Sequence, residues 1–347
     1  MAANDWAIVI GIARYPEFGG NAGAAPRDLD GPVNDAETFM DWLTNPSGGD
    51  VPAGQVIKVT SDDFAAPDVG PDLDDLKAKL NQFKNDIDQA AVPLGRLYIY
   101  ASGHGYGRER LRGGVYLADS KIDKPTDLFI SKYLSWFSER NTFRECVLFC
   151  DACMDQGRLA FPTPVHWLRE IPLGPNTTRS FASYAARFAG QAVEGPMENG
   201  TVHGVYSYAL KLGLDGAAAV ADGNGGRHIT TRSLQDYLIA AMPKLMTDAQ
   251  VSAPAVSKEP DQGPLDDFIL VANPPLFAKD VTIKLPVAAG NSVLLEDASF
   301  ANLGTHAVAG SAVTVNLSPG LYLLRADGGG WEEGFEYTGA ERELDLQ

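Results

Sequence analysis

Apolar residues occur along the chain in two alternating arrangements, short continuous runs and longer runs at helical spacing. Trp6–Ile12 is the first short run, and Val33–Leu43 is the first segment in which apolar residues recur every three or four positions. Short buried runs are typical of parallel strands, and the wider spacing is typical of amphipathic helices. The alternation predicts an α/β fold with helices packed on a mainly parallel sheet.

The same alternation continues as far as residue 271. The further predicted strands are Gln55–Thr60, Leu97–Ala101, Cys146–Cys150, Phe181–Ala186 and Phe268–Val271. The further predicted helices are Leu73–Ile87, Leu128–Phe137, Val205–Leu214 and Ser233–Met246.

The pattern changes after Asn273-Pro274-Pro275, where short alternating segments are divided by Gly, Asn and Pro. These segments are Val281–Leu285, Ser292–Leu295, Ala312–Leu317 and Leu321–Arg325. Alternation with frequent turns is typical of sandwich-like β modules. We therefore expect two domains, an α/β domain at 1–272 and a small all-β domain at 276–347.

Charge and hydropathy narrow the range of partners and compartments. The chain has 28 basic and 45 acidic side chains and a formal net charge of −17. Because nucleic acids and anionic membranes are held by clustered Lys and Arg, we expect neither as a partner. No apolar run reaches the ~18 to 20 residues of a membrane helix, and Met1–Asp5 does not resemble a secretion signal, so we expect a cytoplasmic protein.

The three cysteines lie within eight residues, at positions 146, 150 and 153. Strand alternation places Cys146 and Cys150 on one face of their strand, whereas Cys153 follows the strand end. Four strand residues at ~3.3 Å each separate Cys146 from Cys150 by about 13 Å, too far to share a zinc ion. We expect reduced thiols, with Cys146 and Cys150 in the core and no metal site.

Reactive residues follow two of the predicted strands. His104 comes after Leu97–Ala101, and Cys153 comes after Cys146–Cys150. Functional groups gather beyond the carboxyl ends of parallel strands, so these two side chains are expected to share a crevice if the two strands are neighbours in the sheet. A cysteine nucleophile needs a nearby imidazole and backbone donors for the oxyanion, and the N–H groups of Gly105 and Cys153 are the natural donors.

These elements resemble those of a known family. Ser102-Gly103-His104-Gly105 and Asp151-Ala152-Cys153, together with the segments 6–12, 29–36, 181–186 and 203–210, are similar to the caspase and metacaspase superfamily of cysteine peptidases. The resemblance covers residues 5 to 271 and implies a caspase-like fold and an endopeptidase with a Cys153–His104 dyad acting on protein or peptide substrates. The chain departs from the usual Asp-Ser-Cys-His-Ser-Gly pattern by reading Asp-Ala-Cys-Met-Asp-Gln-Gly from residue 151.

The resemblance also implies a specificity. Metacaspase-like members use acidic residues at the positions of Asp35 and Asp151 to bind an Arg or Lys side chain before the cleaved bond. The plainer alternative is that Asp35 is a solvated acid at a helix start and Asp151 a strand-end cap. Caspases proper use an arginine in the loop that contains Arg27, and they recognise Asp. We favour basic specificity, with Arg27 as the counter-candidate.

The remaining expectations concern regulation and cofactors. Segment Met154–Pro175 follows the nucleophile and is expected to regulate activity by self-cleavage or by ordering on an activating protein partner. We expect that no cofactor is required. Asp222 and Asn224 are candidate calcium contacts, because some family members need calcium. His203 and His166 are expected to be ordinary surface or loop histidines. A catalytically silent scaffold and a hydrolase of non-peptide amides are the alternative functions.

Overall fold

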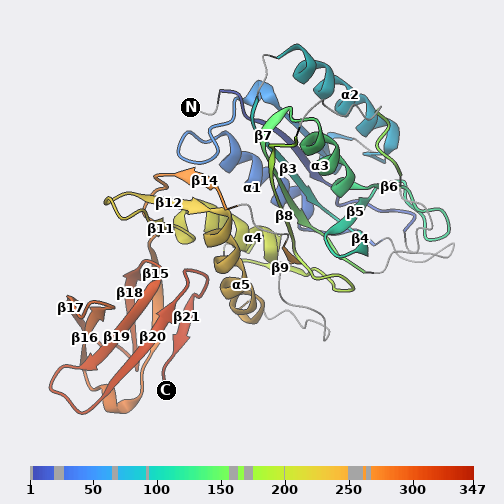
Figure 1. Ribbon diagram of the computed structural model, residues 1–347. Coiled ribbons are helices and arrows are strands. Elements are labelled where there is room, and N and C mark those ends of the chain that lie inside the picture. Colours follow the sequence, from blue (N-terminus) through green and yellow to red (C-terminus); the bar gives the residue numbers. More distant parts are fainter. Residues whose placement is uncertain are drawn as a thin grey trace.

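The computed structural model describes residues 3–18, 27–64, 69–90, 94–155, 163–167, 175–198, 200–248, 261–262 and 267–347. Its central sheet consists of β1 (Trp6–Gly11), β2 (Val56–Thr60), β3 (Leu94–Ser102), β7 (Phe143–Asp151), β8 (Arg179–Tyr184) and β13 (Asp261–Gln262). The strand order is β13-β8-β7-β3-β1-β2, and every neighbouring pair is parallel except β13 with β8. Figure 1 shows β3, β7 and β8 side by side in this sheet. The predicted mainly parallel sheet is therefore confirmed.

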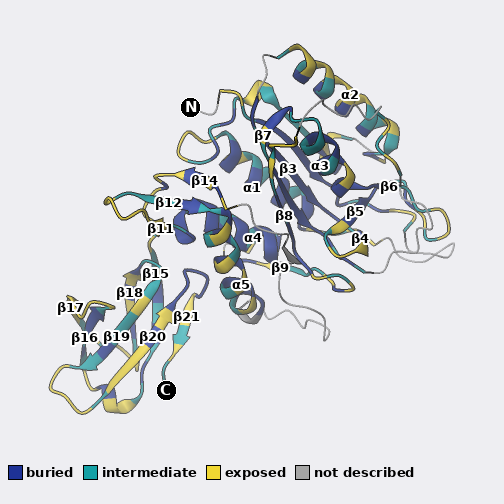
Figure 2. Ribbon diagram, viewed as in Figure 1, coloured by how far each residue is buried: buried dark blue, intermediate teal, exposed yellow. Residues whose placement is uncertain are grey.

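Helices cover both faces of this sheet. One face packs against α2 (Leu73–Gln89) and α3 (Ile130–Glu139), and the other against α1 (Pro32–Thr44), α4 (Val205–Leu212) and α5 (Thr231–Asp248). Successive strand residues point to opposite faces. In β3, for example, Ile99 belongs to the first core and Tyr100 to the second. Because both faces are covered, the central strands are buried almost throughout (Figure 2).

Smaller antiparallel sheets surround the central one. Three strands follow the carboxyl end of β3, namely β4 (Gly105–Glu109), β5 (Arg112–Tyr116) and β6 (Asp127–Leu128). A hairpin joins β9 (Glu194–Pro196) to β10 (Val202–Gly204). A third sheet contains β11 (Val220–Ala221), β12 (Arg227–Thr230) and β14 (Ile269–Ala272).

The C-terminal strands form two sheets around a core of their own. They are β15 (Lys279–Lys284), β16 (Ser292–Asp297), β17 (Asn302–Ala307), β18 (Ala312–Leu317), β19 (Gly320–Ala326), β20 (Glu332–Tyr337) and β21 (Glu343–Asp345). The sheet orders are β18-β15-β21 and β17-β16-β19-β20. Val281, Leu295 and Leu324 lie in the core between them. The predicted all-β part is confirmed, whereas the boundaries 1–272 and 276–347 stay a prediction.

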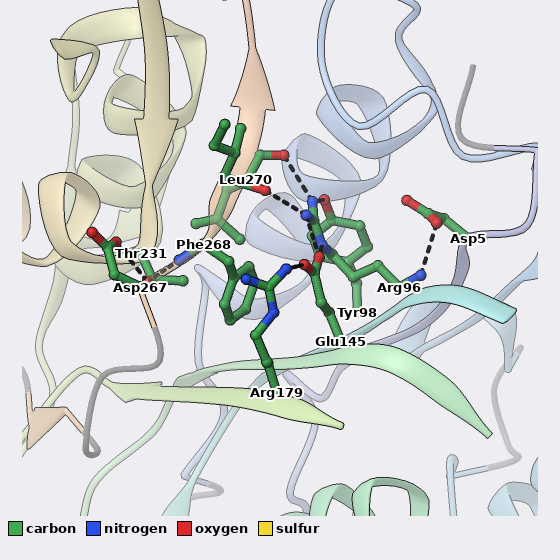
Figure 3. Close-up of polar contacts among 10 residues, drawn as sticks. Asp5, Arg96, Tyr98, Glu145, Arg179, Thr231, Asp267, Phe268 and Leu270 are labelled. Carbon is green, nitrogen blue, oxygen red and sulfur yellow. Dashed lines mark hydrogen bonds and ion pairs between the residues drawn. The ribbon is translucent and has the colours of Figure 1, made fainter. Parts of the chain in front are cut away.

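A polar network ties β14 to the amino-terminal end of the central sheet (Figure 3). Arg96 donates to the Tyr98 hydroxyl at 2.7 Å, to the Leu270 carbonyl at 2.8 Å and to the Glu145 carboxylate at 2.5 Å. Arg179 pairs with the same carboxylate and lies 4.9 Å from the centre of the ring of Phe268. The network therefore fixes the strand that leads into the C-terminal sheets.

Within the described part of the chain, no helix is both long enough and apolar enough to cross a membrane.

Candidate active site

The carboxyl ends of the central strands lie level with one another. The ladders pair Gly11 with Ser102 and Ser102 with Asp151, so the segments that carry His104 and Cys153 leave the sheet side by side. His104 and Cys153 line the same two cavities, of about 110 and 300 Å³. The structure thus brings together the two side chains that the sequence places after neighbouring strands.

Hydrogen bonds fix the orientation of His104. Its backbone N–H donates to the Tyr15 hydroxyl at 2.9 Å, and its Nε2 lies 2.7 Å from the Arg27 carbonyl oxygen. Its ring is 5.3 Å from the ring of Phe18, against which it stacks. A carbonyl only accepts, so Nε2 carries a proton and Nδ1 is the basic nitrogen of the neutral ring. Burial lowers the pKa of His104, which favours this neutral form.

The Cys153 thiol is partly buried and protonated at neutral pH. Its Sγ lies 3.9 Å from the Ala192 carbonyl oxygen, a weak hydrogen bond. Burial, with smaller contributions from the charges of Asp155 and Asp151, raises the pKa of the thiol to about 11. Since the pKa of the histidine is lowered, the free protein holds a neutral thiol beside a neutral imidazole.

Gly105 places a backbone N–H on the strand edge that faces the cysteine. In β4, the N–H of Gly107 donates to the Asp155 carbonyl at 2.7 Å, and Gly105, two residues earlier, presents its N–H at the same edge. A Cβ at position 105 would lie 2.5 Å from the Cβ of Ala152 and 2.9 Å from the Cys153 carbonyl oxygen. Glycine therefore permits this close approach.

Three carboxylates line the smaller of the two cavities. They come from the first turn of α1 (Asp35), the end of β7 (Asp151) and the start of β9 (Glu194). The remaining lining includes Ser102, Gly103, Ala192, Val193 and Gly204. Together with His104 and Cys153, they form an acidic cavity beside the reactive thiol, which we call the acidic cavity.

Asp35 is held by three residues from two strands, β3 and β10. It is 2% exposed and accepts from Ser102 Oγ at 3.1 Å and from the Gly204 N–H at 3.2 Å. His203 Nδ1 lies 2.9 Å from its Oδ1. Burial raises the pKa of Asp35, and the bonds from His203 and Gly204 oppose that shift. The plainer alternative for Asp35, a solvated acid at a helix start, is therefore wrong.

Asp151 is buried against the start of α4. Its Oδ2 accepts from the Ser207 N–H at 3.0 Å and from Ser207 Oγ at 2.6 Å. Burial and then the nearby charge of Asp35 raise its pKa to about 7. A Cβ at position 204 would lie 2.0 Å from Asp151 Oδ2, so only glycine fits there. Asp151 and Asp35 thus form a closely placed buried acid pair.

Two expectations about other side chains have different outcomes. His203 is 6% exposed and bonds Asp35, so its prediction as an ordinary surface or loop histidine is wrong. The hairpin β9–β10 folds over α1 and buries it. Cys146 and Cys150 are 0% and 1% exposed, which confirms their prediction as core residues.

The remaining predicted residues lie outside the acidic cavity. Arg27 lines the larger cavity, together with Phe18, Tyr116 and Lys121. Asp222 Oδ1 accepts from the N–H groups of Asn224 and Gly226 at 2.8 and 2.9 Å, and this closes an exposed turn. His166 is exposed and bonds Tyr133 and Asn81. Most of segment Met154–Pro175, including 156–162 and 168–174, lies outside the described residues.

Comparison with known proteins identifies the family of the chain. Residues 4–253 match the family described as the caspase domain. The chain belongs to the caspase-domain family. Among curated proteins, a probable protease from a Desulfuromonadales bacterium is similar, with 31% identity over 229 residues. That match covers 61% of this caspase-domain chain and 26% of the relative, so the chain spans about a quarter of the relative's length.

Similar solved structures include caspase-1 from Spodoptera frugiperda, with a TM-score of 0.47 and 12% identity over 75% of this chain and 88% of the caspase. A structural-genomics protein from Geobacter sulfurreducens has a TM-score of 0.40 and 13% identity, over 77% of this chain and 93% of that protein.

Proposed function

We propose that the protein is a cysteine endopeptidase that cleaves protein or peptide substrates after Arg or Lys. The observation that carries the proposal is the acidic cavity, because its wall contains both His104 and Cys153. A side chain bound there would place the following peptide bond beside the thiol. The buried pair Asp35 and Asp151 gains most from a cationic occupant, which offsets the repulsion between the two carboxylates.

The proposed mechanism begins from the neutral pair. Cys153 Sγ attacks the scissile carbonyl carbon as its proton passes to His104 Nδ1, and the carbonyl π electrons move onto the oxygen. The N–H groups of Gly105 and Cys153 would hold that oxyanion. The imidazolium then protonates the leaving amine as the C–N bond breaks. His104 next takes a proton from water, which attacks the thioester, and the returning proton regenerates the thiol.

The position of Arg27 supports basic rather than acidic specificity. Its carbonyl oxygen orients His104, and Arg27 lines the larger cavity and is not among the residues of the acidic cavity. An aspartate side chain in the acidic cavity would meet Asp35, Asp151 and Glu194. Like charges at such a site are strongly unfavourable. Cleavage after Asp would need a cationic residue in this cavity, and its lining among the described residues contains no Lys or Arg.

Fluorogenic peptides that differ only in the residue before the cleaved bond test this proposal. We expect hydrolysis after Arg and Lys to exceed hydrolysis after Asp by on the order of 100-fold or more, because the site contains carboxylates that an Asp peptide leaves unpaired. Cys153→Ala should abolish hydrolysis. Cys150→Ala is the matched control, since this thiol is buried in the core, and the variant should keep its activity.

Each contrary result identifies an alternative. Retained hydrolysis in Cys153→Ala overturns the assigned nucleophile. A preference for Asp supports the role of Arg27 as the specificity residue. Failure to cleave any peptide in a library, with calcium or with a chelator, supports a scaffold or a hydrolase of non-peptide amides.

We also propose that the segment after the nucleophile controls activity, by cleavage within Met154–Pro175 or by ordering on a partner. Its first residues are anchored, because Met154 donates to the Gly190 carbonyl at 2.8 Å and accepts from the Ala189 N–H at 2.8 Å. Limited proteolysis before and after activation tests this. Equal protection in both states, with an intact chain in the active preparation, contradicts it.

A further inference from the structure

The β9–β10 hairpin forms one wall of the acidic cavity. Both of its ends contribute, since Glu194 opens β9 and Gly204 closes β10. Glu194 accepts from the Gly31 N–H at 2.9 Å, and the Gly204 N–H donates to Asp35 at 3.2 Å. The position of the hairpin therefore sets the space available to a side chain in the cavity.

The far end of this hairpin is attached to the C-terminal sheets. Glu198 follows β9, and its Oε2 lies 2.5 Å from Lys279 Nζ, on the first residue of β15. The Tyr208 hydroxyl of α4 donates to the same oxygen at 3.2 Å. The Lys279 side chain is only 15% exposed. One carboxylate thus joins the hairpin, a helix of the caspase domain and the C-terminal β strands.

A short series of contacts leads from this carboxylate to the acid pair. The Tyr208 ring lies 5.8 Å from the ring of His203, measured between centroids. His203 in turn bonds Asp35 at 2.9 Å. Two three-residue strands form a marginal hairpin by themselves, so anchoring contacts at its far end determine how firmly it is held.

We propose that the C-terminal β strands contribute to substrate specificity by supporting the wall of the acidic cavity. Lys279 and Glu198 are the positioning residues, and their ion pair holds the β9–β10 hairpin in place for a basic substrate side chain. This inference rests on the proposed function. Neither residue lines the acidic cavity, so both act through the hairpin. The pair should affect substrate binding and leave the reacting groups unchanged.

Kinetics of variants test the inference with an Arg peptide. Lys279→Met and Glu198→Gln should each raise KM about three- to fivefold and leave kcat within about twofold, the size expected for a partly exposed ion pair. The charge-swapped double variant, Lys279→Glu with Glu198→Lys, should restore most of the loss. Lys284→Met is the control, because Lys284 lies on the same strand and pairs with Glu343 instead.

Hydrogen exchange of the hairpin gives a readout that needs no substrate. Amides of 194–204 should exchange faster in Lys279→Met and Glu198→Gln than in wild type or Lys284→Met, and the charge swap should reverse the change. Unchanged exchange in both single variants overturns the inference, as does an unchanged KM. If the wild-type protein cleaves no basic peptide, the proposed function fails, and the exchange experiment still decides whether this contact holds the hairpin.

Discussion

The ionisation of Cys153 determines how the protein reacts before any substrate binds. Burial raises the pKa of this thiol to about 11 and lowers the pKa of His104. Only the thiolate is alkylated, so the rate for iodoacetamide should rise about tenfold per pH unit between pH 7 and 9. Alkylation kinetics of the free protein, followed by mass spectrometry of the Cys153 peptide, measure this rate.

The contrasting result is a rate that stays constant between about pH 5 and 8. Such a plateau indicates a preformed thiolate–imidazolium pair and contradicts the neutral resting state. The Cys153→Ala variant measures the background alkylation of the other two cysteines, which should be slow because Cys146 and Cys150 are buried.

Asp151 should make the binding of cations depend on pH. Its pKa is raised to about 7, so its carboxyl gains charge as pH rises from about 6 to 8. A guanidinium ligand favours the ionised form, and the inhibition constant of agmatine should fall across this interval. Competition against an Arg peptide measures that constant. The Asp151→Asn variant should bind agmatine more weakly, and its inhibition constant should depend less on pH. If the inhibition constant of this variant depends on pH as steeply as that of wild type, another group is responsible for the titration.

At this scale, residues next to apolar strands could be predicted and those depending on distant packing could not. His104 and Cys153 each follow an apolar run that predicts a strand, so the sequence suggested their meeting on the condition that the two strands are neighbours. His203 is the middle residue of a strand of only three residues, β10, and its partner Asp35 is 168 positions away. No local pattern indicates that the hairpin closes over α1. A histidine directly before Gly204-Val205 at a helix start was the one signal available.

Among the elements, the hairpin β4–β5 depends on a hydroxyl from another part of the chain. Tyr15 accepts from the His104 N–H at 2.9 Å and donates to the Tyr116 carbonyl at 3.3 Å, so it bridges two backbone groups at the start of this hairpin. The Tyr15 side chain is itself fully buried. It holds the backbone of the proposed catalytic histidine against the neighbouring strand.

Tyr15→Phe should therefore lower both stability and turnover. Two backbone groups each lose a hydrogen bond, which costs about 1–3 kcal/mol of unfolding free energy. We expect kcat to fall more than KM rises, because the histidine backbone loses its anchor. Urea unfolding and steady-state kinetics measure the two effects. Tyr98→Phe is the matched control: it removes a bond from Arg96 at the other end of β3 and should cost stability without lowering kcat.

The same hairpin consists of two strands that could not be predicted from the sequence. Helices α1 to α5 and the strands of the central sheet other than β13 follow from apolar spacing, with ends shifted by a few residues. The predicted strand Phe268–Val271 is β14, which lies in a separate sheet with β11 and β12. Strands β4 and β5 were not predicted, because Gly105–Glu109 and Arg112–Tyr116 are rich in glycine and charge. They are strands because of their mutual pairing and their contact with the Cys153 segment. Neither property appears in local spacing.

For the whole molecule, the Arg96 network should contribute to stability and not to catalysis. It lies at the amino-terminal ends of the strands, whereas His104 and Cys153 follow the carboxyl-terminal ends. Arg96→Met leaves the largely buried carboxylate of Glu145 with one partner fewer, so we expect a loss of about 3 kcal/mol in unfolding free energy. The value of kcat/KM at a temperature well below unfolding should not change.

Lys84→Met is the control for that measurement. Lys84 pairs with Asp88 on a helix surface, and its loss should cost less than about 0.5 kcal/mol. A cost for Arg96→Met as small as this would show that the network contributes little. Impaired catalysis at low temperature would show instead that the two ends of the sheet are coupled.

The protonated state of the Cys153 thiol has a consequence for chemical probes and inhibitors. Simple haloacetamides depend on a thiolate that the free protein rarely contains, so they should label it sluggishly at neutral pH. Electrophiles attached to a guanidine group, such as arginal peptides, gain occupancy from the carboxylates before any bond forms. Selectivity over other cellular thiols would then come from recognition rather than from intrinsic reactivity.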